Sequence, residues 1–146
     1  MRRVWTFRTV SLAAAIVAFL LVKPSFAQER MSDHDIENVM KNLKEDSQRF
    51  QSNFNSAISK STIRKTSQEK ADKDLVKSFR EQTETMLNQF QDKHKADTTL
   101  PVVMGTAKQI DDIFKNVQLG GSAASSWAKC KSELDILANE FNMPGH

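Results

Sequence analysis

Beyond residue 31, apolar residues recur every three or four positions along the chain. This spacing places them on one face of an α-helix, whereas a half-buried strand would alternate apolar and polar residues. Four such amphipathic stretches follow one another, and none of them alternates. The sequence therefore predicts an all-α domain of four helices.

The first two helices are expected over 32–59 and 66–94, and each has a side chain that can cap its start. Ser32 precedes an acidic turn, which suits the positive end of a helix. Thr66 and Glu69 have the spacing of a capping box. The apolar stripes comprise Ile36, Val39, Met40, Leu43, Phe50, Phe54 and Ile58 on the first helix, and Leu75, Val76, Phe79, Met86, Leu87 and Phe90 on the second.

Two shorter helices are expected over 101–117 and 122–141. We expect Gly120 and Gly121 to end the first of these helices through a positive φ, and Ser122 to cap the second. Their stripes comprise Val102, Val103, Ala107, Ile110, Ile113, Phe114 and Val117, followed by Ala123, Trp127, Cys130, Leu134, Leu137, Ala138 and Phe141.

Four amphipathic helices with short connections predict an up-down-up-down antiparallel four-helix bundle with coiled-coil-like packing. At 1.5 Å per residue, the first two helices would run about 40 Å and the third about 27 Å. The first helical hairpin should therefore be extended, and its tip around residues 58–74 should project past the shorter helices. Ser47, Thr83 and Cys130 interrupt three of the stripes at one level, where polar side chains can fix the register of a bundle or line a small cavity.

Residues 1–27 have the composition of a secretory signal peptide. Three arginines precede an apolar run of about 13 residues, shorter than the roughly 20 that a membrane-spanning helix needs. Ser25 and Ala27 are the small residues that a signal peptidase requires. We expect cleavage after Ala27, which leaves residues 28–146 as one bundle domain, periplasmic or secreted, without a membrane span. A retained membrane anchor is the alternative.

The charge of the chain changes once that segment is removed. The full chain carries a net charge of +3, but residues 1–27 hold four basic residues and no acid. The remaining chain is nearly neutral, so it lacks the strongly basic surface that binds nucleic acid. We expect no nucleic-acid partner.

No side-chain arrangement predicts catalysis, and we expect the protein not to be an enzyme. Ser126 and Lys129 fit the S-x-x-K pattern of penicillin-recognising enzymes, and residues 65–67 resemble their K-T-G element. The order of the two is reversed here, the chain is too short and no strand is expected, so we expect these side chains to lie on a solvated face. Asp111 and Asp112 are adjacent on a helix, so their side chains diverge by about 100°. Cys130 lies on the core stripe, where a thiol is inert; an intermolecular disulfide is the alternative.

In an antiparallel bundle, every histidine and most methionines beyond residue 27 fall at one end. These residues are His34, Met40, His94, Met104, Met143 and His146. Their side chains suit copper or haem iron. The layout resembles periplasmic four-helix b-type cytochromes, which hold haem between a Met on the first helix and a His on the last. Because the fourth helix here has no His, the resemblance implies haem b or copper between Met40 and His94, as the alternative to a protein without cofactor.

We expect an exported, non-catalytic bundle that acts through a protein partner or through self-association. Apolar helical seams bind partner helices or second copies of the same chain. The candidate seam is Phe54, Ile58 and Ile63, which the shorter helices would leave uncovered at the tip of the first hairpin.

Overall fold

The computed structural model describes residues 29–143, and these residues form four α-helices and no strand. The helices are α1 (Asp33–Ile58), α2 (Ser67–Lys93), α3 (Leu100–Asn116) and α4 (Gly121–Glu140). The predicted all-α class and the four helices are confirmed, whereas the predicted signal peptide lies outside the described residues. Within 29–143, no helix combines the length and the apolar character needed to cross a membrane.

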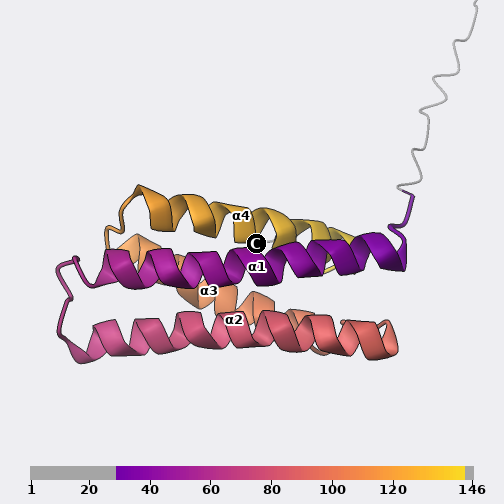
Figure 1. The fold of residues 1–146 in the computed structure, drawn as a ribbon, viewed down its shortest axis with the longest axis horizontal. Helices are drawn as coiled ribbons and strands as arrows, with labels where there is room; N and C mark the ends of the chain where they lie inside the picture. The colour runs from indigo at the N-terminus through magenta and orange to yellow at the C-terminus, as the bar shows by residue number, and fades with distance from the viewer. Residues whose placement is uncertain (1–28, 144–146) are drawn as a thin grey trace, which may run out of the picture.

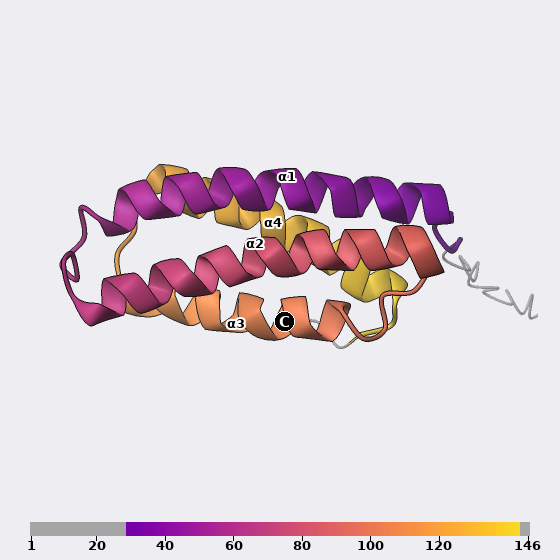
Figure 2. The ribbon, with the colours of Figure 1, turned by 60° about the horizontal axis from the view of Figure 1, so that its bottom comes forward.

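The four helices lie side by side with their long axes roughly aligned (Figures 1 and 2). Two hydrogen bonds join opposite ends of α1 and α4. The backbone N–H of Met31, just before α1, donates to Glu140 Oε2 at 3.2 Å. Near the other end, Asn53 Nδ2 donates to the carbonyl oxygen of Ser122 at 3.4 Å. The end of α1 therefore lies beside the start of α4.

The starts of α1 and α2 are capped as predicted. Ser32 Oγ accepts a hydrogen bond from the backbone N–H of Asp35 at 3.1 Å, and Thr66 Oγ1 accepts one from that of Glu69 at 3.2 Å. The Glu69 carboxylate in turn accepts from the backbone N–H of Lys65, one residue before the cap. These bonds satisfy amide groups that have no partner inside the helix.

The predicted boundary between α3 and α4 is wrong. α3 ends at Asn116 because Val117 has an extended backbone, with φ of −126°. Gly120 is the N-cap of α4, with φ of −66°, and Gly121 is its first helical residue. None of the described glycines has a positive φ. The glycines therefore begin α4 instead of ending α3, and Ser122 lies inside the helix.

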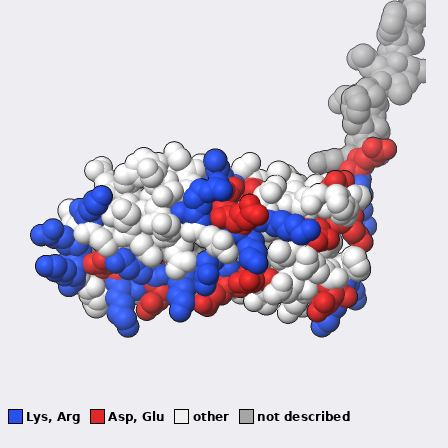
Figure 3. Space-filling model, viewed as in Figure 1, with Lys and Arg blue, Asp and Glu red and all other residues white. Residues whose placement is uncertain are grey.

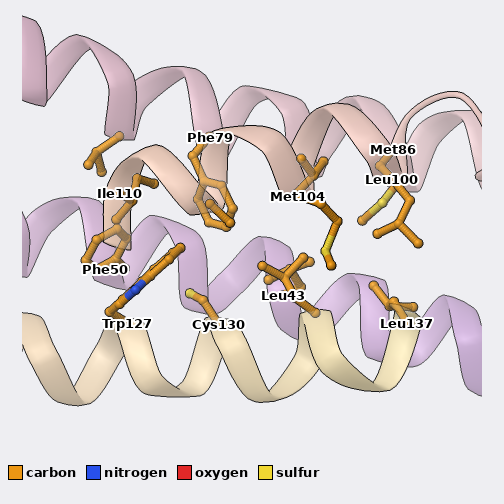
Figure 4. Close-up of a cluster of buried hydrophobic side chains, with 14 of the residues drawn as sticks. Leu43, Phe50, Phe79, Met86, Leu100, Met104, Ile110, Trp127, Cys130 and Leu137 are labelled. Atoms are coloured by element: carbon orange, nitrogen blue, oxygen red, sulfur yellow. The ribbon is translucent and has the colours of Figure 1, made fainter. Parts of the chain in front are cut away.

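An aromatic cluster at the centre of the core receives at least one ring from each helix. Trp127 of α4 lies 4.9 Å from Phe50 of α1 and 5.3 Å from Phe79 of α2, between ring centroids. Phe114 of α3 stacks on Trp127 at 6.4 Å. The indole Nε1 donates to Asp111 Oδ1 at 2.8 Å, which satisfies the one polar group of the ring. Figure 4 shows Trp127 pointing into the core between Phe50 and Phe79.

Two members of the predicted polar layer meet in the core. Ser47 Oγ of α1 lies 3.1 Å from Thr83 Oγ1 of α2, and both residues are fully buried. Each hydroxyl oxygen also lies 2.7 Å from a carbonyl oxygen in its own helix, that of Lys44 or Arg80. Because each hydroxyl has one proton, one of the two can donate to its carbonyl while the other donates across the helix pair. Cys130 of α4 points into the same core (Figure 4).

The expected uncovered seam at the tip of the first hairpin is not present. Phe54 and Ile58 are fully buried, and Leu119 of the α3–α4 connection packs against the core. The backbone is extended at Val117 and Gly120, where each residue advances about 3.3 Å instead of the 1.5 Å of a helix. The connection therefore reaches further than helix lengths alone suggest, and it covers the end of α1.

Candidate functional site

A cleft of about 640 Å³ lies between the start of α2 and the end of α3, two helices that Figure 2 shows side by side. This volume lies within the range of small-ligand sites. Apolar, amide and carboxylate side chains share its lining: Ile63, Gln68, Ala71, Asp72, Leu75, Gln109, Asp112, Ile113, Asn116 and Val117.

Asp72 is the unusual residue of this lining, because its carboxylate occupies a core position of α2. It lies four residues before Val76 and seven before Phe79, and only 4% of it is exposed. Its Oδ1 accepts a hydrogen bond from Gln68 Nε2 at 2.6 Å. Burial raises the pKa of Asp72, and the bond from Gln68 lowers it.

No Lys, Arg or His of the described chain forms an ion pair with Asp72; the recorded pairs involve other carboxylates. A largely buried carboxylate without a cation costs stability, because it has lost part of its hydration and gained no opposite charge. Asp72 therefore needs an explanation beyond the packing of α2.

The α3 wall of the cleft carries a second, exposed carboxylate. Asp112 Oδ1 accepts from Lys115 Nζ at 2.8 Å, and the Asp112 carbonyl accepts from Asn116 Nδ2 at 2.9 Å. Asp111, the adjacent residue, instead accepts from Trp127. The two neighbouring carboxylates thus have different surroundings, as expected from their positions on a helix.

The apolar part of the cleft is continuous with the core. Ile113 and Val117 are buried, and Leu75 and Ile63 are partly buried against the core cluster. Ile63, a predicted partner-binding residue, therefore lines this cleft, whereas Phe54 and Ile58 do not.

The surface of the α1–α2 connection is basic, in contrast to the cleft. Lys60, Arg64 and Lys65 are exposed there, and Figure 3 shows Lys and Arg gathered at this end of the molecule. The charged residues that line the cleft are Asp72 and Asp112, so its own lining is acidic.

The predicted His/Met set is divided between the core and the surface. Its described methionines pack in or against the core: Met40, Met104 and Met143. The side chains of His34 and His94 are instead 81% and 63% exposed. His146 lies outside the described residues.

His94 already has a partner, since its Nδ1 lies 3.3 Å from Asp33 Oδ2. Residues 29–143 contain no group of three or more His, Cys, Asp or Glu arranged to hold a metal ion. Haem or copper between Met40 and His94 stays a prediction that these contacts do not favour.

The single thiol is enclosed by the bundle. Cys130 is fully buried, and burial raises its pKa well above the ordinary value, with smaller contributions from Glu133 and Asp46. A buried thiol of this kind is inert toward nucleophilic chemistry. The alternative of an intermolecular disulfide would require α4 to leave the bundle.

No family model, curated protein or solved structure matches this chain. The cleft is the feature of the described chain that bears on function, and its central residue, Asp72, was not among the residues predicted from the sequence. Asp72 had a readable signal, since it lies in phase with Val76 and Phe79 on the buried stripe of α2.

Proposed function

We propose that the protein is an exported, non-catalytic binding protein whose ligand site is the α2–α3 cleft. The observation that carries this proposal is the buried Asp72 carboxylate, which forms no ion pair with the described residues. A position that served packing alone would be occupied by an apolar residue. Departures from such local rules concentrate at functional sites.

Export and chain topology form part of the same proposal. The signal-like composition of residues 1–27 supports secretion, and the contacts between opposite ends of α1 and α4 support an up-down-up-down antiparallel bundle. Protein recovered from the periplasm or medium of an exporting host should have the mass of residues 28–146. Recovery of the full chain in the membrane fraction would contradict cleavage.

The cleft supports binding better than the helix surfaces do. The exposed large apolar residues of the described chain are Val102 on α3 and Ile136 on α4. Apolar residues scattered singly over a surface are normal and form no seam. Self-association through helices stays a prediction, and the proposal places ligand binding in the cleft.

The proposal can be tested by titrating the exported protein with a fragment library that contains cationic, neutral and anionic compounds. Amide NMR signals of residues 68–75 and 109–117 should shift together, because these segments form the two walls. Gln109→Trp should fill the cleft and abolish the shifts, whereas Lys108→Trp, on an exposed position outside the lining, should preserve them. A library without a cleft binder, or equal effects of both tryptophans, would refute the proposal.

A further inference from the structure

We infer that the cleft binds a small organic cation, whose ammonium group pairs with Asp72 and whose apolar body lies against Ile113 and Val117. This inference rests on the proposed binding function and adds the chemical class of the ligand. It follows from the charge of the lining, the free hydrogen-bond acceptors and the apolar floor.

The charge of the lining selects a cation. Asp72 and Asp112 are its charged residues, and Asp112 already pairs with Lys115 at 2.8 Å. Asp72 forms no such pair with the described residues, and only 4% of this residue is exposed. A ligand cation would supply the missing opposite charge, and a hydrogen bond to a charged group is stronger than one between neutral groups.

The acceptors favour an ammonium group over a guanidinium. Gln68 Nε2 already donates to Asp72 Oδ1, so the other carboxylate oxygen is the one without a donor from this side chain. A guanidinium binds best through both oxygens of a carboxylate, whereas an ammonium needs only one charged acceptor.

Neutral acceptors complete the coordination of such an ammonium group. Gln68 and Asn116 both donate through their amide nitrogens, to Asp72 and to the Asp112 carbonyl. Their amide oxygens take no part in these bonds, so each can accept an N–H of a ligand held in the cleft.

The apolar floor separates an organic cation from a metal ion. The cleft is lined in part by the apolar residues Ile63, Leu75, Ile113 and Val117. Burying the hydrocarbon part of a ligand against them is favourable, whereas a hydrated metal ion needs oxygen ligands that these side chains lack. A volume of about 640 Å³ accommodates a ligand with a short chain or ring beside its charge.

The basic α1–α2 connection acts against the approach of a cation. Lys60, Arg64 and Lys65 are exposed in this connection, and Arg64 directly follows Ile63, which lines the cleft. At physiological salt, exposed charges are partly screened. A partly buried ion pair is screened much less. Binding should therefore persist at physiological salt.

The decisive experiment compares n-hexylamine, n-hexanol and hexanoate, which share an apolar chain and differ in charge. Each is titrated into the exported protein while the amide NMR signals of the two cleft walls are recorded. Hexylamine should bind at least about tenfold more tightly than the other two. Asp72→Asn should weaken hexylamine binding at least about tenfold, because the isosteric amide keeps the shape and removes the charge.

The matched control is Asp74→Asn, two positions further along α2. Asp74 is exposed and pairs with Lys70 at 3.9 Å, so this change should leave hexylamine binding unaltered. If Asp72→Asn does not fold, Gln109→Trp replaces it and should abolish hexylamine binding.

Each contrary outcome has a separate meaning. Tighter cleft binding of hexanol or hexanoate would overturn the cationic ligand and leave the binding function standing. Equal hexylamine binding by the wild type and Asp72→Asn would overturn the role of Asp72. Failure of hexylamine together with every library fragment would overturn both proposals.

Discussion

At the scale of single residues, Glu133 of α4 shows how the bundle perturbs a carboxyl group. Burial and the neighbouring Asp46 of α1 raise the pKa of Glu133 to about 8, although Lys129 and Arg49 act to lower it. Since the pKa in the folded state exceeds the ordinary value of 4.5, the folded state binds the proton more tightly than the unfolded chain. The free energy of unfolding therefore falls as the pH rises from about 4.5 to about 8.

Glu133→Gln should remove much of this pH dependence. A neutral amide keeps the buried shape without ionising, so the free energy of unfolding at about pH 8 should rise by about 1 kcal/mol or more, after allowance for solvent screening. Urea unfolding across about pH 5 to 9 measures the slope. Glu45→Gln, at an exposed position of α1, is the control, and an equal loss of slope in both variants would contradict the prediction.

The hydroxyl contact between Ser47 and Thr83 should show a measurable coupling. Combining Ser47→Ala with Thr83→Val in a double-mutant cycle should give about 0.5–1 kcal/mol of coupling in the free energy of unfolding, from the lost contact between the helices. Each hydroxyl keeps a carbonyl partner in its own helix, so no larger coupling is expected. Strict additivity of the two changes would show that the contact contributes nothing.

Ser47 and Thr83 were predictable from the sequence, whereas Asp72 was not singled out. The first two interrupt long apolar stripes, so their phase alone places them in the core. Asp72 lies at the polar start of α2, where an acidic residue usually faces water. It lines the same cleft as Ile113 and Val117 of α3, which are distant in sequence and come together with Asp72 only in the fold.

At the scale of the elements, α3 has a correctable weakness at its centre. Gly105 is exposed within the helix, and a Cβ added there would have no atom within 4 Å. Gly105→Ala should raise the free energy of unfolding by about 0.5–1 kcal/mol, because alanine has the higher helix propensity. Thermal unfolding followed by circular dichroism measures this gain, and a lower melting temperature would reveal a role for the glycine that its surroundings do not show.

The start of α4 offers a second test. Gly120 is an N-cap without a side-chain hydrogen bond, its φ of −66° suits any residue, and the space for a Cβ is open. Gly120→Asp should stabilise the protein by about 0.5–1 kcal/mol, since the carboxylate can cap α4 and interact with its dipole. The effect should shrink when the pH falls below the pKa of the new carboxyl group, and an effect unchanged at low pH would contradict the mechanism.

The absence of a side-chain cap at Gly120 explains why the starts of α1 and α2 were predicted and the start of α4 was not. Ser32 and Thr66 cap their helices through the side chain, so the residue type alone indicates the start of the helix. Gly120 is the N-cap of α4 but has no side chain that could form a capping hydrogen bond. Ser122, two residues later, is of a type typical of N-caps, so the sequence pattern points to the wrong residue. The sequence pattern could therefore place α4 but not its first residue.

At the scale of the whole molecule, the aromatic cluster predicts a single cooperative unfolding transition. Trp127 contacts rings from α1, α2 and α3, and it is the one tryptophan in residues 28–146. Its fluorescence and the circular dichroism of all helices should therefore change at the same urea concentration. A fluorescence transition that lags behind the loss of helix would show that one helix leaves the bundle first.

The number of helices and most of the core were predictable because each follows from periodicity along a single segment. Val102 is the exception, since it lies on the predicted stripe of the third helix and is 52% exposed. The first hairpin does extend past α3 and α4 (Figures 1 and 2), but the expected uncovered seam failed, because its exposure depended on the relative reach of separate segments. The lengths of α3 and α4 alone predict that neither helix reaches the end of α1. The extended residues Val117 and Gly120 lengthen the connection between α3 and α4, which therefore covers this apolar end. The cleft was equally hard to predict, because its walls come from α2 and α3, which are brought together only by the fold.

Because Cys130 is enclosed by the bundle, its reaction with a thiol reagent would report how often the bundle opens. A thiol reagent can attack only when α4 separates from its neighbours, because the sulfur has no exposed surface in the bundle. Under conditions where reclosing outpaces attack, the labelling rate gives the population of open molecules. The native Cys130 sulfur thus reports opening of the bundle without any substitution in the helices.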